Sequence, residues 1–211
     1  MNQLATVRSL QQRISEMQPL RLGEGGLPVA AGLRPLLPGG ALRKGGSVAV
    51  SGSLHLALAL LAEASRDGAW CGAIGLRHLG FEAVAQLGIS LERFVLVPEP
   101  GRHSLGVAGM LSEVLAALVL VPGQRYTPNE IERLHARLRD HGTVLIAIGE
   151  WPRGDTSLQL LDSCWRGVGR GHGLLETQEL TVRSLDRRGQ RRHTVRFCGG
   201  RLAGAPGEVR P

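Results

Sequence analysis

Apolar runs and helix-like spacings alternate through the middle of this chain. Five short apolar runs bounded by glycine, proline or polar residues predict strands, and the segments between them have the three- and four-residue spacing of helices. The predicted strands are 47–50, 69–74, 93–97, 117–121 and 143–148, and the predicted helices are 53–66, 79–87, 105–115 and 127–141. Strands that alternate with helices in this way indicate an α/β fold with a mainly parallel sheet and right-handed crossovers.

The helix 127–141 has the clearest boundaries. Thr127 is a favoured capping residue, Pro128 suits the first helical position, and Glu130 can bond back to the cap. Gly142 follows the last apolar position and is expected to end the helix. The strand 143–148 comes next and is apolar almost throughout, which is typical of a strand covered on both faces.

The N-terminal part departs from this alternation. Apolar residues recur at three- and four-residue steps before Pro19, which predicts a short amphipathic helix. Its apolar face is formed by Leu4, Val7, Leu10, Ile14 and Met17. The segment 20–46 is rich in glycine and proline and has no steady period, so we expect an irregular path across the surface of the core.

The C-terminal part changes pattern again. A loop is predicted for 150–173, followed by two extended runs, 174–184 and 191–198, that form an antiparallel hairpin at the sheet edge. Residues 199–211 resemble a flexible tail. The predicted organisation is therefore a single domain with extensions: 1–18, 19–46, 47–198 and 199–211.

Charge is concentrated near the C-terminus. The chain has 211 residues and a formal charge of +7, and Lys44 is its one lysine. From residue 166 onward, ten arginines face four acidic residues, a balance of +6. Such a segment suggests an anionic partner, nucleic acid or acidic protein, although arginines on a solvated hairpin are equally common.

The remaining composition favours a globular protein without metal or disulfide. Hydrophobic residues are 43% and charged residues 20% of the chain. Without a long apolar span or a signal-peptide core, we expect a cytoplasmic protein that does not enter membranes. Cys71, Cys164 and Cys198 are far apart and lack ligand spacing, and Cys71 is expected to be a buried thiol.

Three segments carry a family resemblance. Residues 37–50 (LPGGALRKGGSVAV), 52–68 and 86–94 (QLGISLERF) resemble the core of RecA proteins around the phosphate-binding strand and the helix after it. The resemblance implies a three-layer, RecA-like core for 47–198.

The residues that would hold a nucleotide are missing from this pattern. A phosphate loop needs several backbone amides, a lysine, and a serine or threonine on Mg²⁺. Here the loop is reduced to Ser51, Gly52 and Ser53, with Ser53 and Leu54 at the lysine and hydroxyl positions, and Pro122 stands where the family has a metal-associated aspartate. No carboxylate that could activate water is found around Arg77 and His78. We therefore expect no enzymatic activity, catalytic residue, cofactor or metal; a tight turn with a helix cap is the simplest structure for 51–53, and a weak anion site there is the alternative.

Compact size, the shortened loop, Trp151-Pro152 and Gly171-His172-Gly173 resemble ImuA-type mutagenesis accessory proteins of high-GC bacteria. This resemblance implies a nucleoid-associated adaptor in damage-induced translesion synthesis. The partners would be an ImuB-like protein related to the Y-family and a DnaE-type error-prone polymerase. The alternative is a SulA-like inhibitor of cell division that binds an FtsZ-type protein.

Two surfaces are candidates for these contacts. One is the hairpin with Arg187, Arg188, Arg191, Arg192 and Arg196, which could contact DNA or an acidic partner. Aromatic residues are only 3% of the chain, so stacking of single strands is limited and DNA contact would be weak. The other surface comprises the N-terminal apolar face, which would pack on its own core or on a neighbouring subunit, and Trp151 and Trp165 of the predicted loop.

Overall fold

The computed structural model describes residues 26–152, 154–168 and 173–203. The predicted N-terminal helix lies outside these residues, as do Arg153, Gly171 and His172 of the motif 171–173, and most of the predicted tail. No helix in the described part of the chain is long and apolar enough to cross a membrane.

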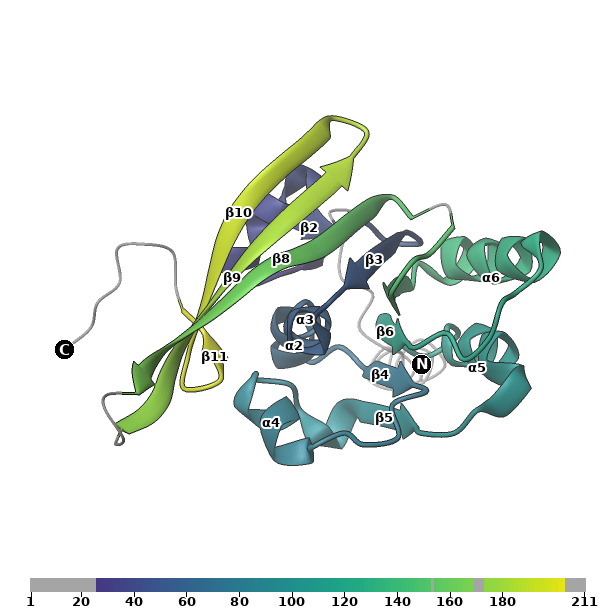
Figure 1. Ribbon diagram of the computed structural model, residues 1–211. Helices are drawn as coiled ribbons and strands as arrows, with labels where there is room; N and C mark the ends of the chain where they lie inside the picture. The colour runs from purple at the N-terminus through teal and green to yellow at the C-terminus, as the bar shows by residue number, and fades with distance from the viewer. Residues whose placement is uncertain (1–25, 153, 169–172, 204–211) are drawn as a thin grey trace, which may run out of the picture.

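The described residues form a nine-stranded mixed sheet (Figure 1). Its order is β11-β10-β9-β8-β3-β7-β6-β4-β5. The strands are β3 (Ser47–Ser51), β4 (Cys71–Ile74), β5 (Phe94–Val97), β6 (Ala117–Leu120), β7 (Val144–Ile148), β8 (Thr156–Val168), β9 (Gly173–Asp186), β10 (Gly189–Cys198) and β11 (Arg201–Leu202). Pairing is parallel from β8 to β5 and antiparallel from β8 to β11, which confirms the predicted mainly parallel sheet with an antiparallel C-terminal edge.

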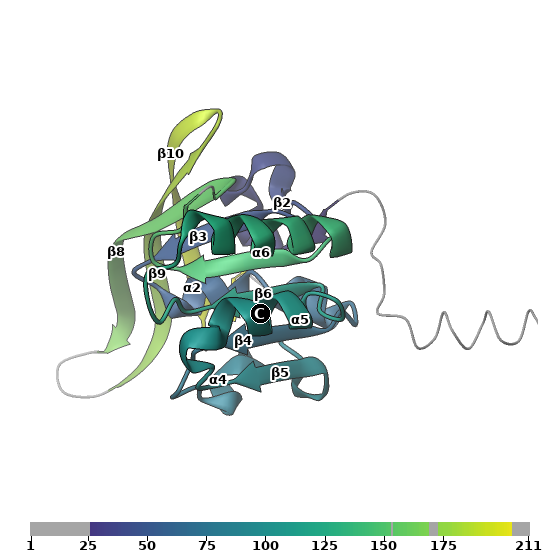
Figure 2. The same cartoon turned by 90° about the vertical axis from the view of Figure 1, so that its right-hand side faces the viewer.

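Helices cover both faces of the parallel part and make three layers (Figure 2). On one face lie α2 (Leu54–Ala59), α3 (Ala62–Arg66) and α4 (Phe81–Gln86), and on the other lie α5 (Ser104–Leu111) and α6 (Pro128–His141). Alternate residues of β3 enter the two cores: Val48 and Val50 join the α2 side, whereas Ala49 joins the α6 side. The central strands are therefore buried on both faces, as their apolar sequences predict.

The boundaries of α6 follow the predicted signals. Thr127 Oγ1 accepts a hydrogen bond from the Glu130 N–H at 3.3 Å, and the Glu130 carboxylate accepts one from the Thr127 N–H at 2.8 Å. The bond from the Thr127 N–H, together with one from the Thr127 hydroxyl to the same carboxylate, lowers the pKa of Glu130. Gly142 ends the helix with φ of 70°.

The predicted helix 53–66 is instead two short helices. The Leu61 N–H donates to the carbonyl of Leu58, three residues back, at 2.9 Å. This tighter turn separates α2 from α3 without exposing the apolar residues, since Leu60 and Leu61 remain fully buried.

The predicted loop 150–173 is wrong over most of its length, because 156–168 form the long strand β8. The beginning of β8 pairs with β3, and nearly all of it pairs with β9. A bulge lies between Leu160 and Asp162, and residues 161–167 are exposed. With both faces in water there is no alternation of apolar and polar residues, which removes the signal from which a strand is predicted.

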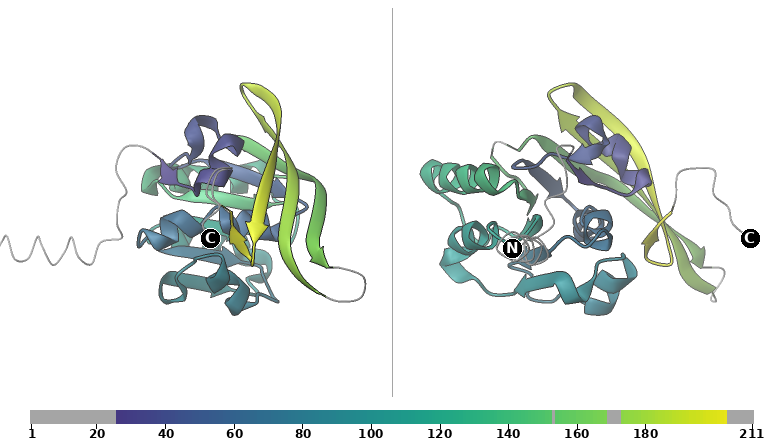
Figure 3. Two further views of the ribbon diagram at one scale, coloured as in Figure 1. Left: turned by 90° about the vertical axis from the view of Figure 1, so that its left-hand side faces the viewer. Right: turned by 180° about the vertical axis from the view of Figure 1, so that it is seen from behind.

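The segment 20–46, expected to cross the surface irregularly, contributes to the core where it is described. It forms β1 (Leu27–Pro28), η1 (Ala31–Leu36), η2 (Pro38–Gly40) and β2 (Ala41–Leu42), with β1 and β2 antiparallel. Leu33 and Leu36 are fully buried and belong to the same core as Phe197 of β10. Figure 3 shows this segment lying against β9 and β10. Part of the predicted tail is also ordered, as β11.

Candidate functional site

The carboxyl end of β3 is the position where the sequence resembles a phosphate-binding strand. Only Gly52 and Ser53 separate β3 from α2. Gly52 has φ of 85°, and a Cβ added there would lie 3.0 Å from Leu160 Cβ. Ser53 Oγ accepts a hydrogen bond from the Leu56 N–H at 3.1 Å. The hydroxyl is thus used as a helix cap, and the link is too short to wrap around phosphates.

The charged groups expected near a nucleotide are elsewhere. Lys44 precedes β3 at its other end, beside Gly142. A carboxylate does reach Arg77 through space, because Glu99 pairs with it at 3.6 Å, but both side chains are about 70% exposed. Arg77 follows β4 and Glu99 follows β5. Two strands lie between β4 and β3, which puts the two strands roughly 14 Å apart. This ion pair was not visible from the residues around Arg77 in sequence, since Glu99 follows the next strand, β5.

Trp151 is buried under α6, with 8% of its surface exposed. Its indole Nε1 donates to His135 Nε2 at 3.1 Å, and its ring meets Tyr126 edge to face. Trp165 is different, since it is 48% exposed on β8. Of the two tryptophans considered as contact residues, only Trp165 presents its ring to solvent.

The hairpin arginines are distributed over two faces and a turn. Arg187 and Arg188 form the β9–β10 turn, whose Asp186 accepts the Arg188 N–H at 2.7 Å. Arg191 faces the core side and pairs with Asp186, which is only 2% exposed. Arg192 and Arg196 face away from it. The five residues therefore do not form one continuous cationic surface.

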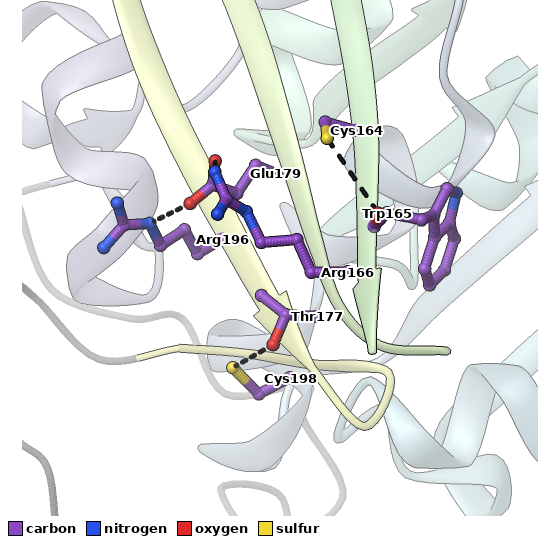
Figure 4. Close-up of polar contacts among 7 residues, drawn as sticks. All are labelled: Cys164, Trp165, Arg166, Thr177, Glu179, Arg196 and Cys198. Carbon is purple, nitrogen blue, oxygen red and sulfur yellow. Dashed lines mark hydrogen bonds and ion pairs between the residues drawn. The ribbon is translucent and has the colours of Figure 1, made fainter. Parts of the chain in front are cut away.

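The outward face of the hairpin carries paired charges (Figure 4). Glu179 on β9 binds Arg196 of β10 at 2.7 Å and Arg166 of β8 at 3.5 Å.

The three cysteines differ in exposure. Cys164 and Cys198 are exposed free thiols, and Cys198 Sγ lies 3.7 Å from Thr177 Oγ1. Cys71, in contrast, is buried in β4 as expected, and burial raises its thiol pKa to about 12. Among the described residues, no group of three His, Cys, Asp or Glu side chains could hold a metal ion.

A cavity of about 510 Å³ lies at the opposite, amino end of β3. It is enclosed by the segment 26–43, the first residues of β3 and β8, and the β9–β10 turn. Asp155 and Asp186 line it, and neither carboxylate was singled out by sequence reasoning as a site residue. Their signal in the sequence is weak, because they are brought together only by the pairing of β8 with β3 and β9.

The comparison with protein families decides the membership of this chain. The model described as MT3502 N-terminal domain matches residues 35–153, which are 119 of the 211 residues. The chain belongs to the MT3502 N-terminal domain family. The match covers the parallel sheet except β8, with its helices on both faces, and ends before the hairpin.

One curated relative of this MT3502 N-terminal domain protein is the uncharacterized protein Rv3395c of Mycobacterium tuberculosis. It is 31% identical over 116 residues, which are 54% of this chain and 57% of that protein. The alignment thus spans little more than half of each chain.

A solved structure, the crystal structure of the RadB recombinase, extends the comparison to the fold. It matches with a TM-score of 0.60 and 15% identity, over 83% of this chain and 97% of that one. The fold of the chain is therefore RecA-like, as the sequence resemblance implied.

Proposed function

We propose that the chain is a non-catalytic RecA-like accessory protein that acts by contacting other proteins and uses no nucleotide. One observation carries this proposal: the link from β3 to α2 consists of Gly52 and Ser53, and the Ser53 hydroxyl is already bonded to the Leu56 N–H. Leu160 packs against Gly52. A nucleotide would have to displace this packing and would find no lysine there.

The process we propose for it is damage-induced, error-prone translesion synthesis. The protein would join an ImuB-like subunit and a DnaE-type polymerase at the nucleoid. Support comes from a RecA-like frame that retains its sheet and helices without phosphate-binding residues, and from the ImuA-type sequence features, among them Trp151-Pro152. A frame of this kind can present surfaces, but it cannot drive a cycle that depends on hydrolysis.

A contact with DNA is proposed only as a weak contribution. Arg187, Arg188 and Arg192 make no ion pair among the described residues, whereas Arg191 and Arg196 are paired with carboxylates. Replacing Arg187, Arg188 and Arg192 with alanine should flatten the dependence of log affinity on log salt by about 0.9 for each DNA phosphate that is no longer neutralised. An unchanged slope would assign these arginines to solubility.

Equilibrium binding of labelled ATP and a phosphate-release assay test the first part of the proposal. We expect no binding at micromolar ATP and no release above the level without protein. Micromolar affinity together with Mg²⁺-dependent turnover would overturn it.

Co-purification after DNA damage tests the second part. We expect recovery of the ImuB-like and DnaE-type subunits, and loss of damage-induced mutation when the gene is deleted. If mutation frequency is unchanged while cell division is altered, the SulA-like inhibitor replaces this proposal.

A further inference from the structure

The cavity at the amino end of β3 is separate from the carboxyl end, where the sequence resembles the phosphate-binding strand of RecA proteins. Its volume of about 510 Å³ lies within the range that binds small ligands or several side chains of a peptide. Three elements enclose it: the segment before β3, the paired starts of β3 and β8, and the β9–β10 turn. Its lining includes Leu37, Pro38, Ala41, Leu42, Val48 and the charged residues of the rim.

The floor of the cavity is apolar. Leu37, Leu42 and Val48 line it, are at most 4% exposed and also belong to the main hydrophobic core. Pro38 and Ala41 lie beside them and are partly exposed. The floor therefore favours an apolar occupant.

The rim of the cavity carries positive charge that the described residues do not fully neutralise. Asp155 accepts the Ser47 N–H at 3.0 Å and pairs with Arg43 at 3.3 Å. Asp186 pairs with Arg191, which stands behind the rim.

With both carboxylates compensated, Arg187 and Arg188 remain as two charges on the turn. Neither makes an ion pair within the part of the chain that the structure describes. The rim therefore favours an anionic group.

The charge of the chain argues against its own segments as occupants. Residues 1–25, which enter the described structure at Gly26 on the cavity wall, contain three arginines and two glutamates, a balance of +1. A second copy of the chain brings a formal charge of +7. Neither supplies the net negative charge that the rim favours.

We infer that this cavity binds an acidic, apolar peptide segment of a partner protein. Apolar side chains of the peptide lie over Pro38 and Ala41, and its carboxylates pair with Arg187 and Arg188. This inference rests on the proposal that the chain acts through protein contacts, and it names the chemistry of one such contact.

A fluorescein-labelled peptide with alternating glutamate and leucine is a direct probe. We expect saturable binding to the full chain, and a loss of about tenfold in the double variant Arg187→Glu, Arg188→Glu. Ala41→Leu, which narrows the cavity without changing charge, should weaken binding by a similar factor. Unfolding midpoints of all variants establish that they are folded.

The control is the double variant Arg125→Glu, Arg201→Glu, which changes the net charge equally. Arg125 lies before α6 and Arg201 lies on β11, and neither lines the cavity. Binding should stay within about twofold of the unmodified chain. An equal loss in rim and control variants would overturn the inference, because net charge alone would then explain binding. Equal binding of a peptide with glutamine in place of glutamate would overturn it too.

Two further outcomes separate this inference from its premise. If Leu20→Asp with Leu22→Asp raises peptide affinity about tenfold, the chain's own N-terminal segment occupies the cavity and the inference fails. If the Arg187→Glu, Arg188→Glu variant binds no peptide but still co-purifies with the ImuB-like subunit, the proposed function stands and this site is not its contact. If the unmodified chain binds the peptide but deletion of the gene leaves damage-induced mutation unchanged, the result would support the site and contradict the translesion role.

Discussion

The two ends of β3 differ in a way that reverses the expectation from the fold. In a sheet with parallel strands, ligands commonly bind outside the carboxyl ends. Here the carboxyl end is closed by a two-residue link and by Leu160, and the amino end opens into a cavity of about 510 Å³. A shared frame therefore does not determine where binding occurs; the connections and the added strands do.

The closed and open ends have the same structural origin. The first residues of β8 pair with residues 48–51 of β3. Leu160 therefore covers Gly52 at the carboxyl end of β3, and the Asp155 carboxylate accepts the Ser47 N–H at its amino end. β9 then runs back along β8 to the Asp186 turn, which lies beside the beginning of β8. The added strands therefore cover the carboxyl end of β3 with Leu160 and place the β9–β10 turn at its amino end. Closing one site and forming the other are consequences of a single addition to the sheet.

The largest effect that we expect comes from adding a methyl group at the closed end. Gly52→Ala should lower the free energy of unfolding by about 2 kcal/mol, because φ of 85° is unfavourable for alanine and its Cβ would lie 3.0 Å from Leu160 Cβ. Gly39→Ala on the cavity wall is the matched variant. Gly39 has φ of 72° and nothing within 4 Å of an added Cβ, so only the backbone cost of about 1 kcal/mol applies.

Urea unfolding of both variants measures this difference. Equal losses would mean that Leu160 does not restrict the carboxyl end, and the contrast between the two ends would then be wrong.

Much of the parallel core could be predicted because its signals are local. The apolar runs of β3 to β7, the Thr127 cap and the glycine after α6 each act within a few residues, and they reappear where expected. The strand β8 could not be predicted, since residues 161–167 are exposed and carry no alternation. The buried positions of Leu33 and Leu36 were missed as well, because a 3-10 helix between prolines and glycines has no regular period.

The candidate sites depend still more on contacts that are distant in sequence. Arg187 and Arg188 were singled out by their charge alone, but the cavity below them requires Asp155, more than thirty residues earlier, and the segment before β3. Arg191 was grouped with them in sequence, although strand alternation turns it toward Asp186 and the core side. Local charge density indicated the region, and the pairing of strands determined which arginines remain free.

A smaller effect is expected at Ser53, where the contrast concerns the use of a hydroxyl. Ser53→Ala removes the cap of α2 and should lower the free energy of unfolding by about 1 kcal/mol, whereas Ser53→Asp retains a capping oxygen and should lower it little.

The double variant Ser53→Lys, Leu54→Thr places the missing side chains of a phosphate loop in the sequence. We expect it to gain no ATP affinity, because the link from β3 remains two residues long. Micromolar ATP binding by this variant would show that the loss of side chains, and not the closed geometry, prevents nucleotide binding.

The smallest effect concerns pH, at a histidine that packs the closed end against the hairpin. The His55 ring on α2 lies 4.2 Å from that of Phe197 on β10, and burial lowers its pKa below 6.5, although a backbone hydrogen bond with Gly200 acts in the opposite direction. Below pH 6.5 the unfolded chain therefore binds a proton that the folded chain resists, so the free energy of unfolding should fall as the pH falls from 6.5 toward 5. His193 contributes in the same direction, since burial and Arg191 lower its pKa as well. Urea midpoints between pH 7.5 and 5 should show a shallower decline for His55→Gln and for His193→Gln, and a shallower one again for the double variant. A decline that is as steep in the double variant as in the unmodified chain would mean that other groups control the acid sensitivity of this contact.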